Sequence, residues 1–370
     1  MKILIISRSF YPMNSPRSFR TTELVKEFSR KGHEVILLTH KQDNVHIPFE
    51  DKYNVKIEDL GKSKIFKIDI TKGNKFSILC KRLIKRMLLQ LIEYPNIELM
   101  FQVRNKLKAK ESIYDLLISI AVPFPIHWGV AWSRNKNNRI AKVWVADCGD
   151  PFYYNIHDSF KKFFYFKYIE KWYSRKTDYI SIPFEGLKKY FFKEFESKYR
   201  VIPQGFNFDN TKIYDKPIKN DVVTFAYAGG FIKTARDPKK FLDFLVTKNT
   251  PFKFIVYNKQ KEFTEPYNDL LGDKLVVKDY IPRKELLYEL SKMDFLVNLE
   301  YDPENQSPSK LIDYSFTKRP ILLIKNNEFY EHVVDEFLSR NYKNKFEMID
   351  IDQYNIENVG QQFLNLVQKE

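Results

Sequence analysis

A short polar segment in the second half of the chain has the residue types of an anion-binding helix start. Ser307 is a good helix N-cap and Pro308 suits the first helical position, so we expect a helix to begin here. The free backbone amides at Ser309 and Lys310, together with the lysine charge, form a ready anion site. Asp313 follows one turn after Ser309, about 6 Å along the helix axis. That offset suits a nucleotide, with phosphates at the helix end and ribose hydroxyls on the carboxylate.

A second group of polar and cationic residues lies in the first loop of the chain. We expect residues 3–7 to form a strand, residues 8–17 a loop, and residues 19–31 a helix that ends at Gly32. Open α/β sheets bind ligands in loops at the carboxyl ends of their strands. The loop has no glycine, which excludes a dinucleotide or Walker-type phosphate cradle, and an ordinary solvated loop is the alternative. Polar and cationic groups are supplied there by Arg8, Asn14, Ser15 and Arg17, and by Ser18 directly after the loop.

The composition limits the classes of ligand. A formal charge of +15 predicts attraction to an anionic partner: a phosphate-bearing substrate, an acidic membrane surface or nucleic acid. Two cysteines give neither a disulfide framework nor a zinc site, and a reducing compartment fits them. The six histidines are scattered and no Asp-x-Asp triplet ends an expected strand, so we expect no metal and no cofactor. Cations and helix amides must then meet the charge of any diphosphate.

The chain is predicted to fold as two α/β domains. Short apolar runs alternate with longer amphipathic segments, as in parallel sheets covered by helices, and 370 residues exceed what one core usually supports. We predict doubly wound Rossmann-like domains at residues 1–205 and 206–345, and a helical tail at 346–370 that packs back on the domains. The expected strands are residues 3–7, 34–39, 115–120, 142–146, 179–182 and 200–202, and then 222–228, 252–257, 274–277, 295–299 and 321–324.

Several separated segments resemble the GT-B glycosyltransferases, in particular the retaining family 4-like enzymes that assemble bacterial polysaccharides. In the first half, segments similar to the family's first strand, second-strand start, sheet end and linker start are KILIISRSFYP, KGHEV, WVADCGDPF and VIPQGFN. In the second half, segments similar to its glycine turn, carboxylate motif and following strand are FAYAGGF, NLEYDPENQSPSKLIDY and KRPIL. The resemblance implies two Rossmann-like domains that face a cleft.

The resemblance implies a nucleotide-sugar site in the second domain. The glycine turn lets the backbone approach a diphosphate, and Arg236 corresponds to a basic residue that clamps the donor phosphates. The family's glutamate pair is degenerate, with Asn305 and Asp313 in its two places and Glu304 beside the first. For Arg236 and Lys233 the alternative is a surface cation without a ligand. For the segment 307–310 the alternative is a well-capped helix start and nothing more. The predicted donor-binding residues are Gly205, Gly229, Gly230, Lys233, Arg236, Glu304, Asn305, Ser307, Ser309, Lys310 and Asp313.

The resemblance also implies the reaction. Relatives transfer the sugar with retention at the anomeric carbon and without metal, and front-face attack by the acceptor hydroxyl is the usual proposal for them. Cations and helix amides stabilise the departing nucleoside diphosphate. Packing is the alternative for the catalytic histidine, and loop capping for the two catalytic aspartates. The predicted catalytic residues are His127, Asp147 and Asp150, and the predicted acceptor-binding residues are Arg8, Asn14, Ser15 and Arg17.

Two basic, aromatic stretches indicate a membrane-bound acceptor. Residues 75–110 and 160–195 mix apolar and cationic side chains, as interfacial helices do, although a core-facing helix with a solvated basic side is the alternative. The apolar run at 116–132 is interrupted by prolines and a glycine, which predicts a strand, a loop and a helix start. No signal peptide is recognised at residue 1. We expect a cytoplasmic enzyme, peripheral on the inner face of the cell membrane, with a lipid-diphosphate-linked saccharide as acceptor.

Other functions remain open. A DNA-modifying GT-B glycosyltransferase would place the excess charge along a phosphate backbone, although no nucleic-acid-binding module is recognised and we do not expect nucleic acid as a partner. A nucleotide-sugar epimerase of related fold would need carboxylate and histidine acid–base groups, which the sequence does not assemble convincingly. A membrane-surface protein that has lost donor binding is compatible with Asn305 and Asp313.

Overall fold

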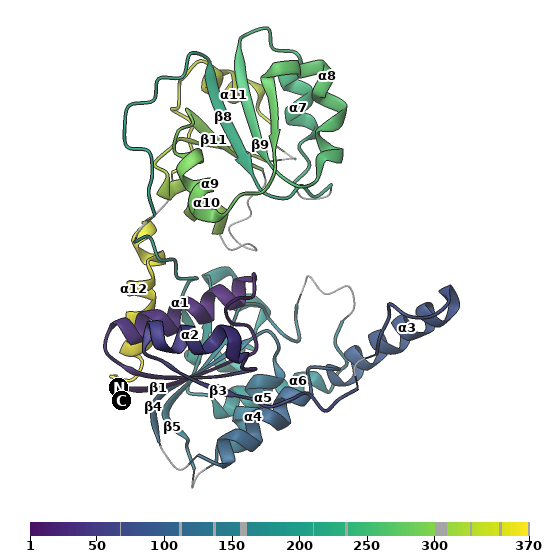
Figure 1. The fold of residues 1–370 in the computed structure, drawn as a ribbon, viewed down its shortest axis with the longest axis vertical. Helices are drawn as coiled ribbons and strands as arrows, with labels where there is room; N and C mark the ends of the chain where they lie inside the picture. Colours follow the sequence, from purple (N-terminus) through teal and green to yellow (C-terminus); the bar gives the residue numbers. More distant parts are fainter. Residues whose placement is uncertain are drawn as a thin grey trace. The chain divides into compact units, whose positions relative to one another are not determined.

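The chain forms two compact units, each a parallel sheet covered by helices (Figure 1). The first unit comprises Met1–Asn207 and Tyr354–Glu370, and the second comprises Phe208–Gln353. The predicted tail at 346–370 is thus divided, and its helix belongs to the first unit. The computed structural model describes residues 1–66, 68–110, 113–135, 138–155, 161–209, 211–233, 236–299, 309–325, 328–347 and 350–368.

The sheet of the first unit has seven parallel strands in the order β3-β2-β1-β4-β5-β6-β7. The strand order reverses between β1 and β4, which places the ligand crevice of such a sheet outside their carboxyl ends. Alternate residues of β1 face opposite sides, so Ile3 and Ile5 enter one core while Leu4 and Ile6 enter the other. The strands are β1 (Lys2–Ser7), β2 (Glu34–Thr39), β3 (Lys56–Asp59), β4 (Tyr114–Ala121), β5 (Ala141–Cys148), β6 (Tyr179–Ile182) and β7 (Tyr199–Val201).

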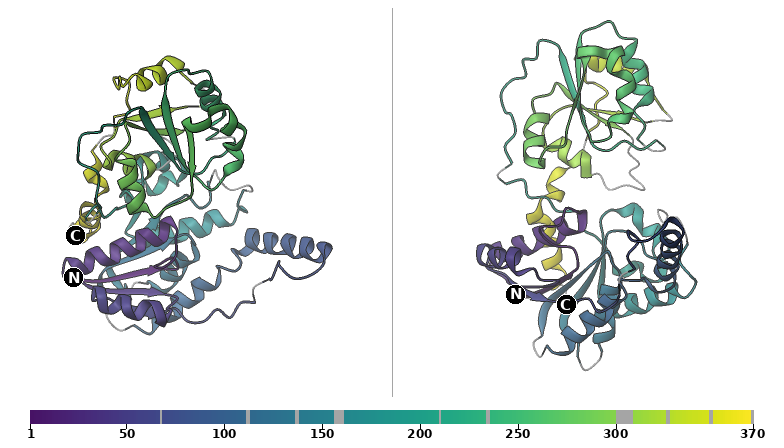
Figure 2. Two further views of the ribbon diagram at one scale, coloured as in Figure 1. Left: turned by 45° about the horizontal axis from the view of Figure 1, so that its top comes forward. Right: turned by 45° about the vertical axis from the view of Figure 1, so that its right-hand side comes forward.

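Helices cover both faces of this sheet. One face carries α1 (Pro16–Arg30), α2 (Asp43–Tyr53) and α12 (Ile356–Asn365), and α12 lies beside α1 in Figures 1 and 2. The other face carries α4 (Glu98–Lys108), α5 (Pro125–Ser133) and α6 (Phe166–Lys176). Short 3-10 helices span Glu185–Tyr190, Lys193–Lys198 and Ile351–Tyr354.

One helix of the first unit covers neither face. The helix α3 (Lys75–Ile92) extends away from the body of the unit, as the left view of Figure 2 shows, and none of its residues is buried. Asn74 caps its first turn by accepting a hydrogen bond from Ser77 N at 2.8 Å. The helix is therefore locally well formed but makes little use of the protein core.

The second unit has a five-stranded parallel sheet in the order β10-β9-β8-β11-β12. Its cores contain side chains of α7 and α11 on one face and of α9 and α10 on the other. The strands are β8 (Val223–Ala228), β9 (Phe252–Tyr257), β10 (Leu275–Lys278), β11 (Phe295–Leu299) and β12 (Ile321–Ile324). The helices are α7 (Lys239–Val246), α8 (Asn268–Leu271), α9 (Arg283–Leu290), α10 (Ser309–Phe316) and α11 (Glu331–Leu338), with 3-10 turns at Lys261–Phe263, Glu265–Tyr267 and Gly272–Lys274.

All predicted strands are found, and the differences have local causes. The strand β3 was not predicted, because it is a short edge strand whose sequence KIED is mostly charged. The helix α1 begins earlier than predicted, because Ser15 caps it and Pro16 occupies its first turn. The predicted stop of that helix is confirmed, since Gly32 has φ +79° and donates to Ser29 O at 2.8 Å.

Candidate functional site

The carboxyl edge of the second sheet carries the predicted phosphate-binding elements. The strand order reverses between β8 and β11, and ligands of such sheets bind at that switch point. Gly229 and Gly230 follow β8 directly, and α10 begins at Ser309 after the residues that follow β11. The predicted helix start is therefore confirmed, and it lies beside the predicted glycine turn.

Lys310 reaches from the first turn of α10 to the glycine turn. Its Nζ lies 4.2 Å from the centroid of the Tyr227 ring and 3.1 Å from the Tyr227 hydroxyl. A Cβ at Gly229 would lie 2.8 Å from Lys310 Cε and would also overlap Nζ. The φ angle of Gly229 is +149°, which L side chains rarely adopt. Any other residue here would need a strained backbone angle and would displace the end of the Lys310 side chain.

Arg236 supplies a second cation at the same place. Its backbone pairs with that of Ile232: Arg236 N donates to Ile232 O at 2.7 Å, and Ile232 N donates to Arg236 O at 3.2 Å. Burial and the charge of Arg236 lower the pKa of Lys310 to about 7. Within the described ranges, neither cation is paired with a carboxylate. Lys233 is exposed. Two neighbouring cations with no acidic partner among the described residues favour an anionic ligand.

Two buried tyrosines fix α10 against the end of β8. The Tyr227 hydroxyl donates to Gly230 O at 2.9 Å, and the Tyr314 hydroxyl accepts from Ala228 N at 2.8 Å. Lys310 and Tyr314 are four residues apart and so lie on one side of α10. Phe231 stacks on Tyr227 with ring centroids 5.0 Å apart. The tyrosines therefore set the position of the lysine relative to the glycine turn.

Asp313, the predicted ribose ligand, is held by an arginine that the sequence analysis did not identify. Arg283, the first residue of α9, donates from Nε and Nη2 to Asp313 Oδ1 at 3.0 and 2.5 Å, and from Nε to Oδ2 at 3.2 Å. Burial raises the pKa of Asp313, and Arg283 offsets this only in part. The Asp313 side chain is 25% exposed, so a ligand can still reach it.

The other predicted donor residues fall into two groups. Glu304, Asn305 and Ser307 lie outside the described residues. Gly205 lies in the first unit, where a Cβ would be 2.5 Å from Ile356 Cδ1 and 3.3 Å from Val359 Cβ. Close packing against α12 accounts for this glycine, and its contact with a donor stays a prediction.

In the first unit, the predicted acceptor loop is shorter than expected. Ser15 accepts a hydrogen bond from Ser18 N at 3.2 Å, so it serves as the N-cap of α1. Asn14 is exposed, and Arg8 is exposed and donates to Asn96 Oδ1. Arg8 thereby links the loop after β1 to the residues that follow α3.

Asp147 forms a buried ion-pair network. Arg20 donates to both of its carboxylate oxygens, at 2.8 and 3.3 Å, and Arg17 approaches at 3.4 Å. Ser181 adds a hydrogen bond at 2.7 Å. Burial alone would raise the pKa of Asp147, but the two arginines outweigh it and lower the pKa. Asp150, by contrast, is exposed and close enough to act on the charge of Arg17. The geometry gives Asp147 a structural role and leaves Asp150 accessible.

His127 lies in the first turn of α5, within the run 116–132 for which a strand, a loop and a helix start were predicted. Its side chain is 0% exposed, and burial lowers its pKa to about 3. Nδ1 lies 2.8 Å from Ser119 Oγ, and Nε2 lies 3.6 Å from Cys148 Sγ. The packing alternative therefore fits this neutral, enclosed histidine best.

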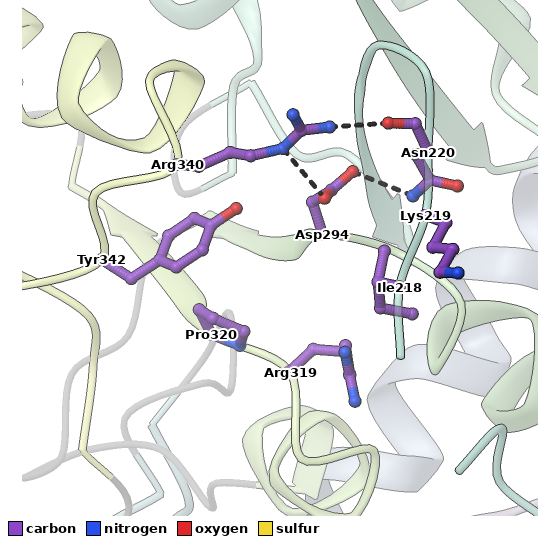
Figure 3. A pocket seen from close by; sticks show the side chains of 8 residues that line it. All are labelled: Ile218, Lys219, Asn220, Asp294, Arg319, Pro320, Arg340 and Tyr342. Atoms are coloured by element: carbon purple, nitrogen blue, oxygen red, sulfur yellow. Dashed lines mark hydrogen bonds and ion pairs between the residues drawn. The ribbon is translucent and has the colours of Figure 1, made fainter. Parts of the chain in front are cut away.

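A pocket of the second unit lies at the opposite edge of its sheet. Asn220 and Asp294 precede β8 and β11, and Arg340 follows α11 (Figure 3). Arg340 donates to Asn220 O at 2.7 Å, and Asn220 Nδ2 donates to Asp294 Oδ2 at 2.9 Å. These contacts join the segments that precede β8 and β11 to the residues that follow α11. Across the described part of the chain, no three His, Cys, Asp or Glu side chains gather to hold a metal ion.

Sequence reasoning missed three residues of the phosphate edge. Arg283 is 30 positions from its partner Asp313, so no local spacing indicates the pair. Tyr227 belongs to the apolar run that predicts β8, so its sequence position does not indicate its contact with Lys310. Tyr314, four residues after Lys310, could have been found from helical spacing.

Comparisons with solved structures give the fold. A glycosyltransferase from Rickettsia africae covers 100% of this chain and 98% of its own, with 12% identity and a TM-score of 0.61. HepE of Anabaena, in complex with UDP and glucose, covers 100% of both chains with 11% identity and a TM-score of 0.57. The lipopolysaccharide outer core galactosyltransferase WaaB covers 100% and 99%, with 12% identity and a TM-score of 0.58. The predicted GT-B fold is thereby confirmed. No protein-family model matches the sequence, and no curated protein matches it.

Proposed function

We propose that the protein is a glycosyltransferase that takes a sugar from a nucleotide-diphosphate donor. One observation carries this proposal. Lys310 and Arg236, both without a carboxylate partner in the described ranges, lie beside a turn at which any residue other than glycine would be strained. This is an anion site at the switch point of a doubly wound sheet. HepE, of similar fold, has been solved with UDP and with UDP-glucose, which supports a nucleotide sugar as the donor here.

In this proposal the two cations stabilise the leaving group. As the bond from the anomeric carbon to the diphosphate breaks, negative charge grows on the diphosphate oxygens. Arg236 can hold two of these oxygens, while Lys310 and the first amides of α10 meet the remaining charge. Retention at the anomeric carbon, independence of metal and membership of the family 4-like enzymes are part of the proposal. The exposed Asp150 is the remaining acid–base candidate of the predicted three.

We propose further that the acceptor is lipid-linked and that α3 lies in the membrane surface. Residues at helical spacing form one apolar stripe on α3, and its members Phe76, Leu83 and Met87 are 75%, 59% and 54% exposed. The helix has no acidic residue. At helical spacing Lys81 and Lys85 lie opposite the stripe, and Lys75, Arg82 and Arg86 flank it. An apolar stripe backed by cations matches the boundary of an anionic bilayer.

Polysaccharide assembly at the inner face of the cell membrane would place the enzyme where such acceptors lie. Arg8 follows β1 and contacts Asn96 just beyond α3, and in this proposal it binds a phosphate of a lipid-diphosphate acceptor. Among the helices of the described ranges, none is both long and apolar enough to cross a membrane.

A flotation experiment tests the membrane proposal. Wild-type protein should float with vesicles that contain phosphatidylglycerol and should bind neutral vesicles weakly. Replacing Leu83 and Met87 with glutamine should abolish flotation while leaving nucleotide binding intact. The matched control replaces Leu4 of the buried sheet with valine, which should leave flotation unchanged. Equal flotation of the α3 variant and the wild type would refute this part of the proposal.

A transfer assay tests the enzymatic proposal. The protein is incubated with labelled nucleotide sugars and a bacterial lipid extract, and label in the lipid phase is measured. We expect transfer from at least one donor, and a loss of roughly 100-fold or more when Lys310 is replaced by alanine. Transfer to lipid-free duplex DNA and to none of the lipids would instead support a DNA-modifying enzyme. Conversion of a donor sugar to its epimer without transfer would support an epimerase.

A further inference from the structure

The ion pair between Arg283 and Asp313 joins two helices at the phosphate edge of the second sheet. Arg283 begins α9, and Asp313 lies in α10, one turn after Lys310. Residues three apart on a helix are surface neighbours, so the Asp313 carboxylate lies next to the proposed phosphate site. A carboxylate in this place would repel a diphosphate unless its charge were compensated.

Arg283 compensates that charge and also limits how the carboxylate can turn. Both of its contacting nitrogens approach Oδ1, at 3.0 and 2.5 Å, whereas Oδ2 receives one longer contact of 3.2 Å. A carboxylate can accept about four hydrogen bonds, so Oδ2 retains the greater capacity to accept another. The two side chains are 35% and 25% exposed, so a ligand can approach the pair from solvent.

A ribose offers the donors that this arrangement lacks. Its two vicinal hydroxyls can donate to one carboxylate, and a hydrogen bond to an ionised acceptor is stronger than a neutral one. The arginine fork fixes the carboxylate plane, which a lysine would do less well because its ammonium is a point charge. The selectivity of such a site comes from the penalty of leaving the oriented carboxylate without its hydroxyl partners.

We infer that Arg283 is a positioning residue: it orients Asp313 toward the ribose hydroxyls and thereby makes the site selective for ribonucleotides. The inference rests on the proposed function, because it requires a nucleoside diphosphate at the Lys310 and Arg236 site. It adds a role that the phosphate-binding cations cannot supply, since they do not distinguish ribose from deoxyribose.

Calorimetry on the full chain separates the two roles. The probes are inorganic pyrophosphate, UDP, GDP and ADP, and the 2′,3′-dideoxy form of each nucleotide. For the nucleotide that binds best, we expect the wild type to prefer the ribose form by roughly tenfold or more, as for a charge-assisted hydrogen bond. Arg283→Met should reduce that preference to less than about threefold. The uncompensated charge of Asp313 should also weaken pyrophosphate binding, but it weakens the ribose and dideoxy forms alike and so cancels in the preference. Arg283→Lys should retain an intermediate preference, because it keeps the charge and loses the fork.

The outcomes are distinguishable. A full ribose preference in Arg283→Met, or no preference in the wild type, would overturn the inference while leaving the proposed function intact. A loss of pyrophosphate binding in Arg283→Met with the ribose preference kept in full would also overturn it, since the residue would then serve only the phosphate site. Because Arg283→Met removes an ion pair, circular dichroism checks the fold. If that variant unfolds, Asp313→Asn provides the same comparison and should lose the same preference. Failure of the wild type to bind any of these probes would refute the proposed function itself.

Discussion

The ammonium of Lys310 lies over the ring of Tyr227, 4.2 Å from its centroid and 3.1 Å from its hydroxyl. A desolvated ammonium commonly has a carboxylate beside it, and among the described residues an aromatic face takes that place here. The ring steadies the cation without neutralising it, so the charge remains available to a ligand. Arg236 adds a second positive charge nearby, which further favours an anionic ligand.

The glycine turn offers a matched pair of variants. Gly229→Ala should weaken nucleoside-diphosphate binding by at least about tenfold, because its Cβ displaces Lys310 and strains a φ of +149°. Gly230→Ala should have a much smaller effect, since the nearest atom to its Cβ is Gln260 Oε1 at 3.3 Å. Calorimetry on both variants measures the difference. Equal losses of affinity at the two positions would show that the contact between Gly229 and Lys310 does not control binding.

Lys310 predicts a pH dependence of binding. The pKa of the free lysine is lowered to about 7, and a bound diphosphate raises it by favouring the ammonium. Below pH 7 the site is already charged, whereas between pH 7 and 9 binding must take up a proton. Affinity for UDP should therefore fall by up to about tenfold per pH unit above pH 7.

Lys310→Arg is the control for this pH profile, because a guanidinium stays protonated throughout the range. Titrations in buffers of different ionisation enthalpy should show proton uptake at pH 8 for the wild type and almost none for the variant. A flat wild-type profile from pH 7 to 9 would contradict a titrating lysine at the site.

The two predicted catalytic aspartates should behave differently when replaced by asparagine. Asp147→Asn breaks a buried pair with Arg20, which costs about 3–5 kcal/mol of folding free energy. Asp150→Asn changes an exposed side chain and should leave the stability within about 0.5 kcal/mol. Urea unfolding measures the stability, and the transfer assay measures the activity. A stable Asp147→Asn protein would show that the network does not hold the fold.

Glu170 predicts a loss of stability at higher pH. It is 2% exposed, accepts a hydrogen bond from Tyr153 N at 2.9 Å, and burial raises its pKa to about 8. The folded state therefore keeps a proton that the unfolded state loses near pH 4.5. The contribution of the protonated Glu170 to the free energy of unfolding is complete below about pH 4.5. It declines as the pH rises to about 8, by up to about 1.4 kcal/mol per pH unit.

Glu170→Gln removes that titration and keeps an acceptor oxygen for Tyr153. The variant should gain stability relative to the wild type between pH 5 and pH 8, as measured by urea unfolding at both values. An unchanged difference across this range would mean that Glu170 ionises normally in the folded protein.

The sequence predicted the fold well because the fold depends on local patterns. Apolar runs of four to eight residues marked the central strands, since parallel strands are buried on both faces. The edge strand β3 escaped notice because its sequence KIED carries charges toward solvent. The start of α1 at Pro16 was missed although Ser15 and Pro16 form a recognisable cap.

The site was only partly predictable. Gly229 and Lys310 could be found because glycine turns and helix starts have local signatures. Their mutual contact could not, because it depends on how α10 packs on β8 through Tyr314. His127 and Asp147 were predicted to be catalytic because histidine and aspartate often are. Both side chains are buried in the core, which depends on tertiary packing and could not be predicted from the sequence.

The central claim is that the second unit binds a nucleoside diphosphate through Lys310 and Arg236. Calorimetric titration of UDP, GDP and ADP into the full chain tests this most directly. We predict that at least one of them binds, and that Lys310→Ala and Arg236→Ala each weaken its affinity by roughly 10- to 100-fold without unfolding the protein. No measurable affinity for any of the three, or wild-type affinity in both variants, would contradict the account.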